Sequence, residues 1–203
     1  MTVSRRDLVV AFSALMASPA MGGDAAVRVG HLAPAFEARD VDGKMIALSQ
    51  FKGRTVVLEW TNPECPWVAK HYVSSNLQSL QADAASKGVV WLTVSSAAPG
   101  NPGYLDALEA AALVDQRQAK AAHFLLDRDG RMLRDYAVSV ALTLAVIAPD
   151  GRLAYYGAID DQPNARAEDV AKARNYVRAA LAAVANGEMP SPAQTRPYGC
   201  SPR

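Results

Sequence analysis

The sequence predicts a single α/β domain in which helices flank a central mixed β-sheet. Short apolar, β-branched runs alternate with segments whose apolar residues recur at helical spacing. A Pro-Asp-Gly turn at 149–151 separates two further apolar runs, which is typical of an antiparallel hairpin. Of the 203 residues 50% are hydrophobic and 20% are charged, so the chain can bury a substantial core.

In the first half of the chain, the sequence predicts a strand, a helix and a second strand. Residues 55–60 and 89–94 are rich in apolar and β-branched residues, which indicates buried strands. Between them, the apolar residues share one helical face that starts after position 65, and Gly88 ends the helix. The residues on this face are Ala69, Val73, Leu77, Leu80 and Ala84.

The second half predicts a helix, a strand, a short helix, a hairpin and a last helix. The first three cover residues 105–118, 123–126 and 132–136, and the hairpin strands cover 142–148 and 153–158. The last helix should begin near Glu168 and end at Asn186-Gly187. Its apolar face would carry Val170, Ala173, Val177, Leu181 and Val184.

The first 25 residues predict a signal peptide. Arg5 and Arg6 precede a short apolar run, and Ser18-Pro19-Ala20 offers a cleavage site, with Ala25 as a second candidate. The apolar run, about ten residues, is too short to span a bilayer. The twin arginine resembles a twin-arginine translocation signal, although Leu8 stands where that pattern favours Phe. An ordinary secretory signal is the alternative, and both routes predict a periplasmic protein.

After cleavage the chain would consist of a domain over 26–188 and a tail over 189–203, without membrane insertion. The formal net charge is +1, so the sequence offers no electrostatic basis for binding nucleic acid or a membrane surface. A metal site of Cys65 with His71 or His123 lacks any known ligand spacing. We therefore expect no metal and no cofactor.

Cys65 is the strongest candidate for a reactive residue. It follows the predicted strand 55–60 and stands just before Pro66, which is favoured in the first turn of a helix. The positive end of the helix dipole stabilises a thiolate and lowers the pKa of the thiol, and the thiolate is the nucleophilic form. The alternative is a buried structural cysteine or one half of an inert disulfide.

Cys200 is the only other cysteine, and it lies in a tail rich in Pro and Ser. A bridge to Cys65 would close a loop of about 135 residues, worth roughly 5 kcal/mol in the chain-entropy model. That figure does not distinguish structural from catalytic use. We expect the tail to swing rather than pack, which suits a resolving thiol that must reach the first sulfur and then leave it.

Six other positions are weaker candidates. Trp60 and Trp67 flank the predicted sulfur site, where they could pack in the core or form an aromatic rim for a thiol substrate. Lys70 and His71 could stabilise a thiolate, but their spacing points them away from the helix start, which predicts solvated surface residues. The pair Asp160-Asp161 is consistent with a turn or with a family motif.

The segment Glu59-Trp60-Thr61-Asn62-Pro63-Glu64-Cys65-Pro66-Trp67-Val68-Ala69-Lys70-His71-Tyr72 resembles the active site of a peroxiredoxin-like branch of the thioredoxin superfamily. This redoxin branch is grouped with the alkyl hydroperoxide reductase and thiol-specific antioxidant proteins. Further matches lie at 30–36, 88–92, 156–161 and 197–201. The resemblance implies a thioredoxin-like fold and an active Cys65. A protein or small-molecule thiol or disulfide would be the substrate, and an unknown electron donor would act with it.

The chain departs from related patterns at its active site. A thioredoxin has Cys-x-x-Cys, but the second position here is Val68. Peroxiredoxins need Pro-x-x-x-Thr/Ser-x-x-Cys to orient peroxide, but Leu58 and Asn62 occupy the Pro and hydroxyl positions. The resemblance therefore does not predict a peroxidase.

A further departure concerns the loop opposite the active site. Relatives usually have Thr followed by a cis-Pro, where this chain has Ala141-Leu142. A cis bond before a residue other than Pro costs about 3–4 kcal/mol, so we predict a trans bond. In this fold the loop offers backbone groups to an extended substrate, which makes Ala141 and Leu142 the candidate substrate-binding pair, beside Trp60 and Trp67.

The sequence thus predicts an exported thiol–disulfide oxidoreductase with Cys65 as nucleophile and Cys200 as resolving cysteine. One alternative is a peroxide-reducing antioxidant protein that uses the same two sulfurs. The other is a non-catalytic binding domain in which a Cys65–Cys200 disulfide is purely structural.

Overall fold

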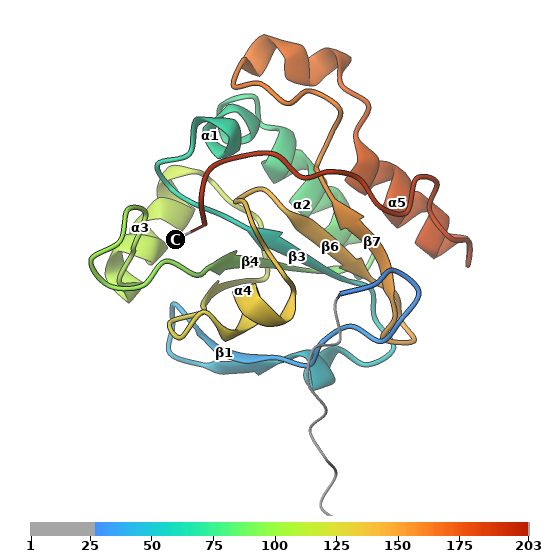
Figure 1. Cartoon of the computed structure of the whole chain (residues 1–203), viewed down its shortest axis with the longest axis horizontal. Coiled ribbons are helices and arrows are strands. Elements are labelled where there is room, and N and C mark those ends of the chain that lie inside the picture. The colour runs from blue at the N-terminus through green and yellow to red at the C-terminus, as the bar shows by residue number, and fades with distance from the viewer. Residues whose placement is uncertain (1–26, 203) are drawn as a thin grey trace, which may run out of the picture.

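The computed structural model describes residues 27–202. It shows one seven-stranded sheet with the strand order β2-β1-β5-β4-β3-β6-β7, flanked by helices (Figure 1). The predicted α/β class and mixed sheet are therefore confirmed. The predicted signal peptide over 1–25 lies outside the described residues. Within the described part of the chain, no helix has the length and apolar character needed to cross a membrane.

From β3 onward, strands and helices follow one another in the order that the sequence predicts. The strands are β1 (Glu37–Asp40), β2 (Met45–Ala47), β3 (Val56–Trp60), β4 (Val90–Ser95), β5 (His123–Leu126), β6 (Leu144–Ile147) and β7 (Leu153–Gly157). The α-helices are α1 (Pro66–Val73), α2 (Asn76–Ser86), α3 (Ala107–Gln116), α4 (Arg131–Asp135) and α5 (Tyr176–Ala185). Two 3-10 helices cover Leu48–Phe51 and Ala167–Lys172.

The centre of the sheet positions the site. Strand β3 pairs in parallel with β4, which pairs in parallel with β5, and β6 runs antiparallel on the other side of β3. Every residue of β3 is buried. Its carboxyl end therefore delivers the chain from the middle of the sheet directly to Cys65 and α1.

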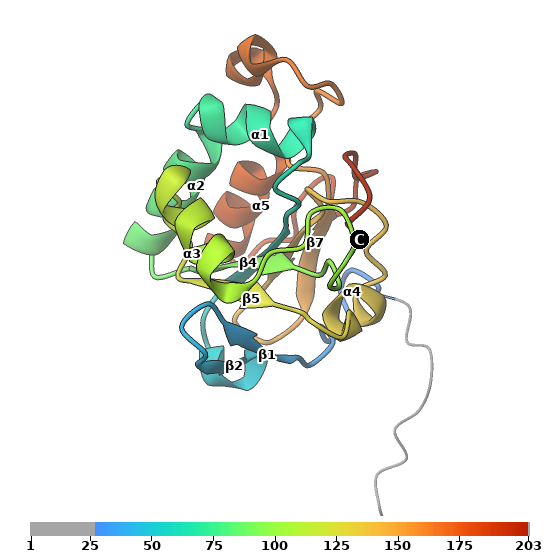
Figure 2. The same cartoon turned by 90° about the vertical axis from the view of Figure 1, so that its left-hand side faces the viewer.

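The two larger apolar cores of the described residues lie on the two faces of the sheet. Val57 faces a core shared with α1, α2 and α5, whereas Leu58 faces a core shared with α4 and the β1–β2 hairpin. Figure 2 shows α2 and α5 on one side of the sheet and α4 on the other. Cys65 belongs to the first core, so the site lies on the α1 side.

The structure corrects three expectations about the elements. The predicted helix after Cys65 breaks into α1 and α2, because Ser75 adopts a left-handed backbone with φ 57°. Val73, which was expected on the apolar face, is 74% exposed as a result. The last helix begins later than predicted, because Ala173 is extended and the Asn175 side chain caps α5 by accepting from Arg178 N. The edge strands β1 and β2 were not predicted.

Candidate functional site

Cys65 occupies the strand-to-helix junction that the sequence predicts. It is the N-cap residue of α1, with Pro66 in the first turn. Its N–H donates to Asn62 O at 3.2 Å, and its carbonyl accepts from Ala69 N at 2.9 Å. The residue is only 1% exposed. Cys65 therefore lies at the N-terminal, positive end of the α1 dipole and is shielded from water.

The two cysteines of the chain form a disulfide. Cys65 and Cys200 are 135 positions apart in sequence, and their Cα atoms are 5.7 Å apart. The tail runs from the end of α5 across the top of the sheet and ends beside the start of α1 (Figure 1, dark red). The tail therefore extends far enough to bring Cys200 to Cys65, as a redox pair of these two cysteines requires.

The tail packs against the domain, contrary to the expectation that it swings. Tyr156 N donates to Ala193 O and Thr195 N donates to Tyr156 O, both at 3.1 Å, so the tail pairs with the edge of β7. The Thr195 hydroxyl accepts from Ala158 N at 2.9 Å and lies 2.6 Å from Tyr155 Oη. Gly157 allows this approach, because a Cβ there would overlap Thr195. The sequence pattern of Pro and Ser did not reveal these contacts.

The loop at Ala141-Leu142 holds the end of the tail. Ala141 N donates to Cys200 O at 2.8 Å, and Leu142 N donates to Trp60 O at 2.6 Å. The bond before Leu142 is trans, as predicted, since the cis bond of the described chain is Ser191-Pro192. Leu142 adopts φ 67°, a left-handed conformation that is rare for this residue type. Both loop residues are buried, and the tail pairs with the backbone of Ala141.

Gly199 fits only because it has no side chain. Its φ is 143°, which L-residues rarely adopt, and a Cβ would overlap the carbonyl oxygen of Ala141. Asn62 adds a further contact, since its Nδ2 donates to Ser201 O at 3.0 Å. Its Oδ1 accepts from Glu64 N at 2.9 Å. Both ends of the Asn62 amide are therefore engaged within the protein.

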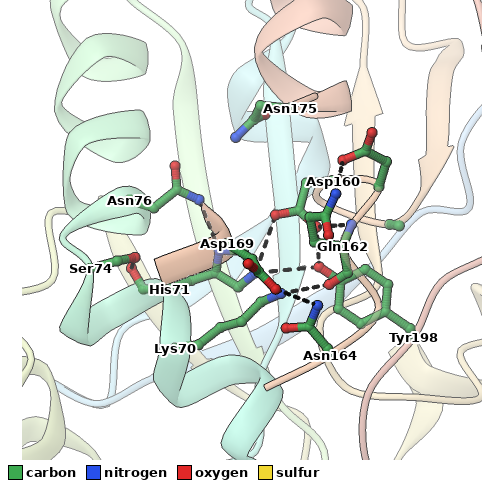
Figure 3. Close-up of polar contacts among 12 residues, drawn as sticks. Lys70, His71, Ser74, Asn76, Asp160, Gln162, Asn164, Asp169, Asn175 and Tyr198 are labelled. Carbon is green, nitrogen blue, oxygen red and sulfur yellow. Dashed lines mark hydrogen bonds and ion pairs between the residues drawn. The ribbon is translucent and has the colours of Figure 1, made fainter. Parts of the chain in front are cut away.

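Lys70 and His71 are buried, so the prediction of solvated surface residues is wrong (Figure 3). Lys70 Nζ donates to Gln162 O at 2.6 Å. Asn76 Nδ2 donates to His71 Nδ1 at 2.9 Å, which places the ring proton on Nε2. That nitrogen lies 3.4 Å from Tyr198 Oη. The helix face that spacing alone would leave in water is covered by the tail and by the segment after β7.

Asp160 completes this polar cluster. The Tyr198 hydroxyl donates to Asp160 Oδ1, which also accepts from Gln162 N at 2.9 Å. Asp160 Oδ2 lies 3.8 Å from His71 Nε2. Lys70 Nζ lies 5.2 Å from the centroid of the Tyr198 ring. Burial, followed by the hydrogen bond to Asp160, raises the pKa of Tyr198 far above its usual value. The phenol therefore acts as a donor at every physiological pH.

Burial, together with the nearby Lys70 ammonium, lowers the pKa of His71 to about 3. Between this value and the unfolded value of about 6.5, the unfolded chain binds a proton that the folded chain does not. Acid should therefore destabilise the fold through His71. We expect the free energy of unfolding of the wild type, relative to that of His71→Gln, to fall by about 2 kcal/mol between pH 7 and pH 5.

Denaturant unfolding of the oxidised proteins at these two pH values measures this difference. The exposed His31, changed to Gln, is the matched control. If the difference in free energy of unfolding between wild type and His71→Gln is the same at pH 7 and pH 5, His71 is not a buried, neutral imidazole in the folded protein.

A second buried carboxyl group, Glu59, lies on β3 in the same core. Trp91 Nε1 donates to its Oε2 at 2.8 Å, Gln81 Nε2 donates to the same oxygen at 3.1 Å, and Tyr72 Oη donates to Oε1 at 3.2 Å. Burial raises the pKa of Glu59. Sequence reasoning missed this residue, although a lone carboxylate inside an apolar strand was visible. Trp91, Tyr72 and Gln81 thereby tie β4, α1 and α2 to the strand that carries the site.

The two candidate tryptophans lie in different places. The Trp60 ring is fully buried against Tyr136 in the α4 core, with ring centroids 5.2 Å apart, so it does not line the sulfur site. The residue contributes its carbonyl, which accepts from Leu142 N. Trp67 is partly buried and packs against the core that contains Cys65. Of the two, only Trp67 can present its ring near the disulfide.

The chain is similar to several solved structures and to a protein-family model. No curated protein matches the chain. A hypothetical protein from Sinorhizobium meliloti is 20% identical with a TM-score of 0.73, over 87% of this chain and 94% of its own. An uncharacterized conserved protein from Geobacillus kaustophilus is 24% identical with a TM-score of 0.73, over 87% and 92%.

The thioredoxin domain of a thiol-disulfide oxidoreductase from Bacteroides vulgatus is 18% identical with a TM-score of 0.54 and covers 72% of this chain and 98% of that domain. These likenesses show a thioredoxin-like fold. The family model described as Redoxin matches residues 28–176. This match includes Cys65, the buried polar residues Lys70, His71 and Asp160, and the 141–142 loop, and the chain belongs to the redoxin family.

Proposed function

We propose that the protein is an exported thiol–disulfide oxidoreductase in which Cys65 is the nucleophile and Cys200 the resolving cysteine. The observation that carries this proposal is the pairing of the two sulfurs at the start of α1, with the Cys200 backbone bonded to Ala141. The N-terminus of a helix stabilises a thiolate, which favours attack by Cys65 and also its departure as a leaving group.

The reaction runs in two exchanges. The Cys65 thiolate attacks one sulfur of a substrate disulfide, a mixed disulfide forms, and the other substrate sulfur leaves as a thiolate that takes up a proton. The Cys200 thiolate then attacks Cys65 Sγ, the protein disulfide forms, and the second substrate thiolate leaves. The substrate gains two electrons and the protein loses two. A dithiol donor then restores the reduced protein in two exchanges. One donor thiolate attacks Cys65 Sγ and the Cys200 thiolate leaves; the second donor thiolate attacks the mixed disulfide and the Cys65 thiolate leaves, so that the donor ends as a disulfide.

The docking of the tail supports a polypeptide substrate. In this fold the 141–142 loop offers its backbone to an extended segment, and here Cys200 O accepts from Ala141 N in that place. The tail thus occupies the position that a substrate strand would take during the mixed disulfide. The similar fold of the thiol-disulfide oxidoreductase from Bacteroides vulgatus agrees with this chemistry. Residues 1–25 would direct export to the periplasm, with the twin arginine as the basis for the twin-arginine route.

Reduction potential and turnover together test the proposal. We expect a midpoint potential for the Cys65–Cys200 pair above about −300 mV, the value below which structural disulfides usually lie. The mature protein should also accelerate reduction of a peptide disulfide by a dithiol. In the same assay hydrogen peroxide should react more slowly, because Asn62 replaces the peroxide-orienting hydroxyl and is itself engaged. A potential below this value, with no turnover, would identify a structural disulfide.

A further inference from the structure

We propose that Tyr198 is a positioning residue whose docking between Lys70, His71 and Asp160 holds Cys200 beside Cys65 after the disulfide is reduced. We call these three residues the tyrosine pocket. The inference rests on the proposed function in treating the disulfide as reversible. It assigns to the pocket the control of how readily the resolving thiol meets Cys65.

Two residues of the tyrosine pocket lie close in sequence to Cys65, and Tyr198 itself lies close in sequence to Cys200. Lys70 and His71 lie on the helix that begins immediately after Cys65, and Tyr198 lies two residues before Cys200. Asp160 comes from the segment after β7 and points between them (Figure 3). The Tyr198 side chain therefore holds the tail close to the sulfur that it must reach, in addition to the backbone contacts with β7 and Ala141 and independently of the covalent bond.

The charges in the pocket favour an occupied state. Asp160 is buried, and its Oδ1 accepts from Tyr198 Oη and from Gln162 N. Its Oδ2 accepts no hydrogen bond from any residue that the structure describes. If the tail departs, this buried carboxylate loses one of its few donors, and hydrogen bonds to charged groups are the strong ones. Lys70 Nζ lies over the Tyr198 ring, which adds a cation–π contact.

Two states follow from this arrangement. In the docked state, the pocket and Ala141 N hold the tail, so the effective concentration of Cys200 at Cys65 is high. In the open state, Cys65 and the 141–142 loop are free for an external disulfide. The strength of the Tyr198 contact sets the balance between them. A weaker contact should make the protein disulfide easier to reduce and Cys65 more accessible.

Tyr198→Phe tests this with the loss of one hydroxyl group. In the mature protein equilibrated with reduced and oxidised glutathione, we expect the equilibrium constant for closing the disulfide to fall about 10- to 100-fold, the range for a hydrogen bond to a charged acceptor. In a Cys200→Ser background, alkylation of Cys65 by iodoacetamide should accelerate when Tyr198→Phe is added.

Tyr136→Phe is the matched control, because it removes a buried phenol whose hydroxyl donates to Pro34 O at 2.7 Å, away from the tail. Asp160→Asn is a second probe of the pocket and should shift the glutathione equilibrium in the same direction as Tyr198→Phe. If Tyr198→Phe leaves both the equilibrium and the alkylation rate within twofold of the parent, the inference is wrong. It is also wrong if Tyr136→Phe changes the equilibrium and the rate as much as Tyr198→Phe does.

These measurements do not depend on turnover. A shifted equilibrium in a protein without exchange activity would support the pocket and reject the proposed function. Normal turnover of the wild type, with an unchanged glutathione equilibrium in Tyr198→Phe, would support the proposed function and reject the role of the tyrosine pocket.

Discussion

Replacing Cys65 by serine should reduce thiol–disulfide exchange by about a thousandfold or more, because a serine hydroxyl is almost un-ionised at neutral pH and cannot form the mixed disulfide. Cys200→Ser should retain the first attack and lose the resolving step. With a peptide disulfide as substrate, mass spectrometry should therefore find a stable adduct on Cys65 in Cys200→Ser. Cys65→Ser should give no corresponding adduct through Cys200.

The two variants control for each other. Both lose the same cross-link, worth at most about 5 kcal/mol of stability in the chain-entropy model, so a difference in activity between them cannot come from that loss. An adduct on Cys200 in Cys65→Ser, with none on Cys65 in the other variant, would reverse the assigned roles. If oxidised wild-type protein holds both thiols free, or pairs them between chains, the intramolecular resolving role is wrong.

Local sequence patterns predicted most of the strands and helices of the fold. The apolar run ending at Trp60 and the run 89–94 predicted β3 and β4, and the turn at 149–151 predicted the hairpin of β6 and β7. The break between α1 and α2 was missed because the apolar spacing continues across it. Only the backbone of Ser75 changes, and serine is compatible with both outcomes.

The site was predictable where its chemistry is local. Cys65 could be placed at a helix start from Pro66 and the preceding strand, and this position is confirmed. The burial of Lys70 was not predictable, because its partner carbonyl at Gln162 lies 92 positions away in sequence. Helical spacing says which face a side chain occupies, but a distant segment decides whether that face meets water.

The tail illustrates the same limit. Its Pro and Ser content suggested mobility, whereas its contacts with β7 and with Ala141 come from backbone groups that composition does not reveal. Gly199 is the glycine of the tail, and its lack of a side chain permits the tight approach to Ala141. Glycine in sequence is compatible with many roles, and only the position of the Ala141 carbonyl identifies this one.

Gly199→Ala should therefore undock the tail more strongly than the loss of the Tyr198 hydroxyl. The new Cβ would overlap the Ala141 carbonyl oxygen, and φ 143° is unfavourable for alanine. We expect the equilibrium constant for closing the Cys65–Cys200 disulfide with glutathione to fall more than about 100-fold, since an unfavourable backbone conformation alone costs about 1–3 kcal/mol and the overlap adds to it.

The control for this variant is Gly187→Ala, which shares a positive φ of 73° but has open space around the new Cβ. It should leave the glutathione equilibrium near that of the wild type while it destabilises the end of α5. An equal shift of the glutathione equilibrium in both variants would mean that the effect comes from a general loss of stability. An unchanged equilibrium in Gly199→Ala would mean that the tail reaches Cys65 without the Ala141 contact, and the 141–142 loop would then have no part in positioning Cys200.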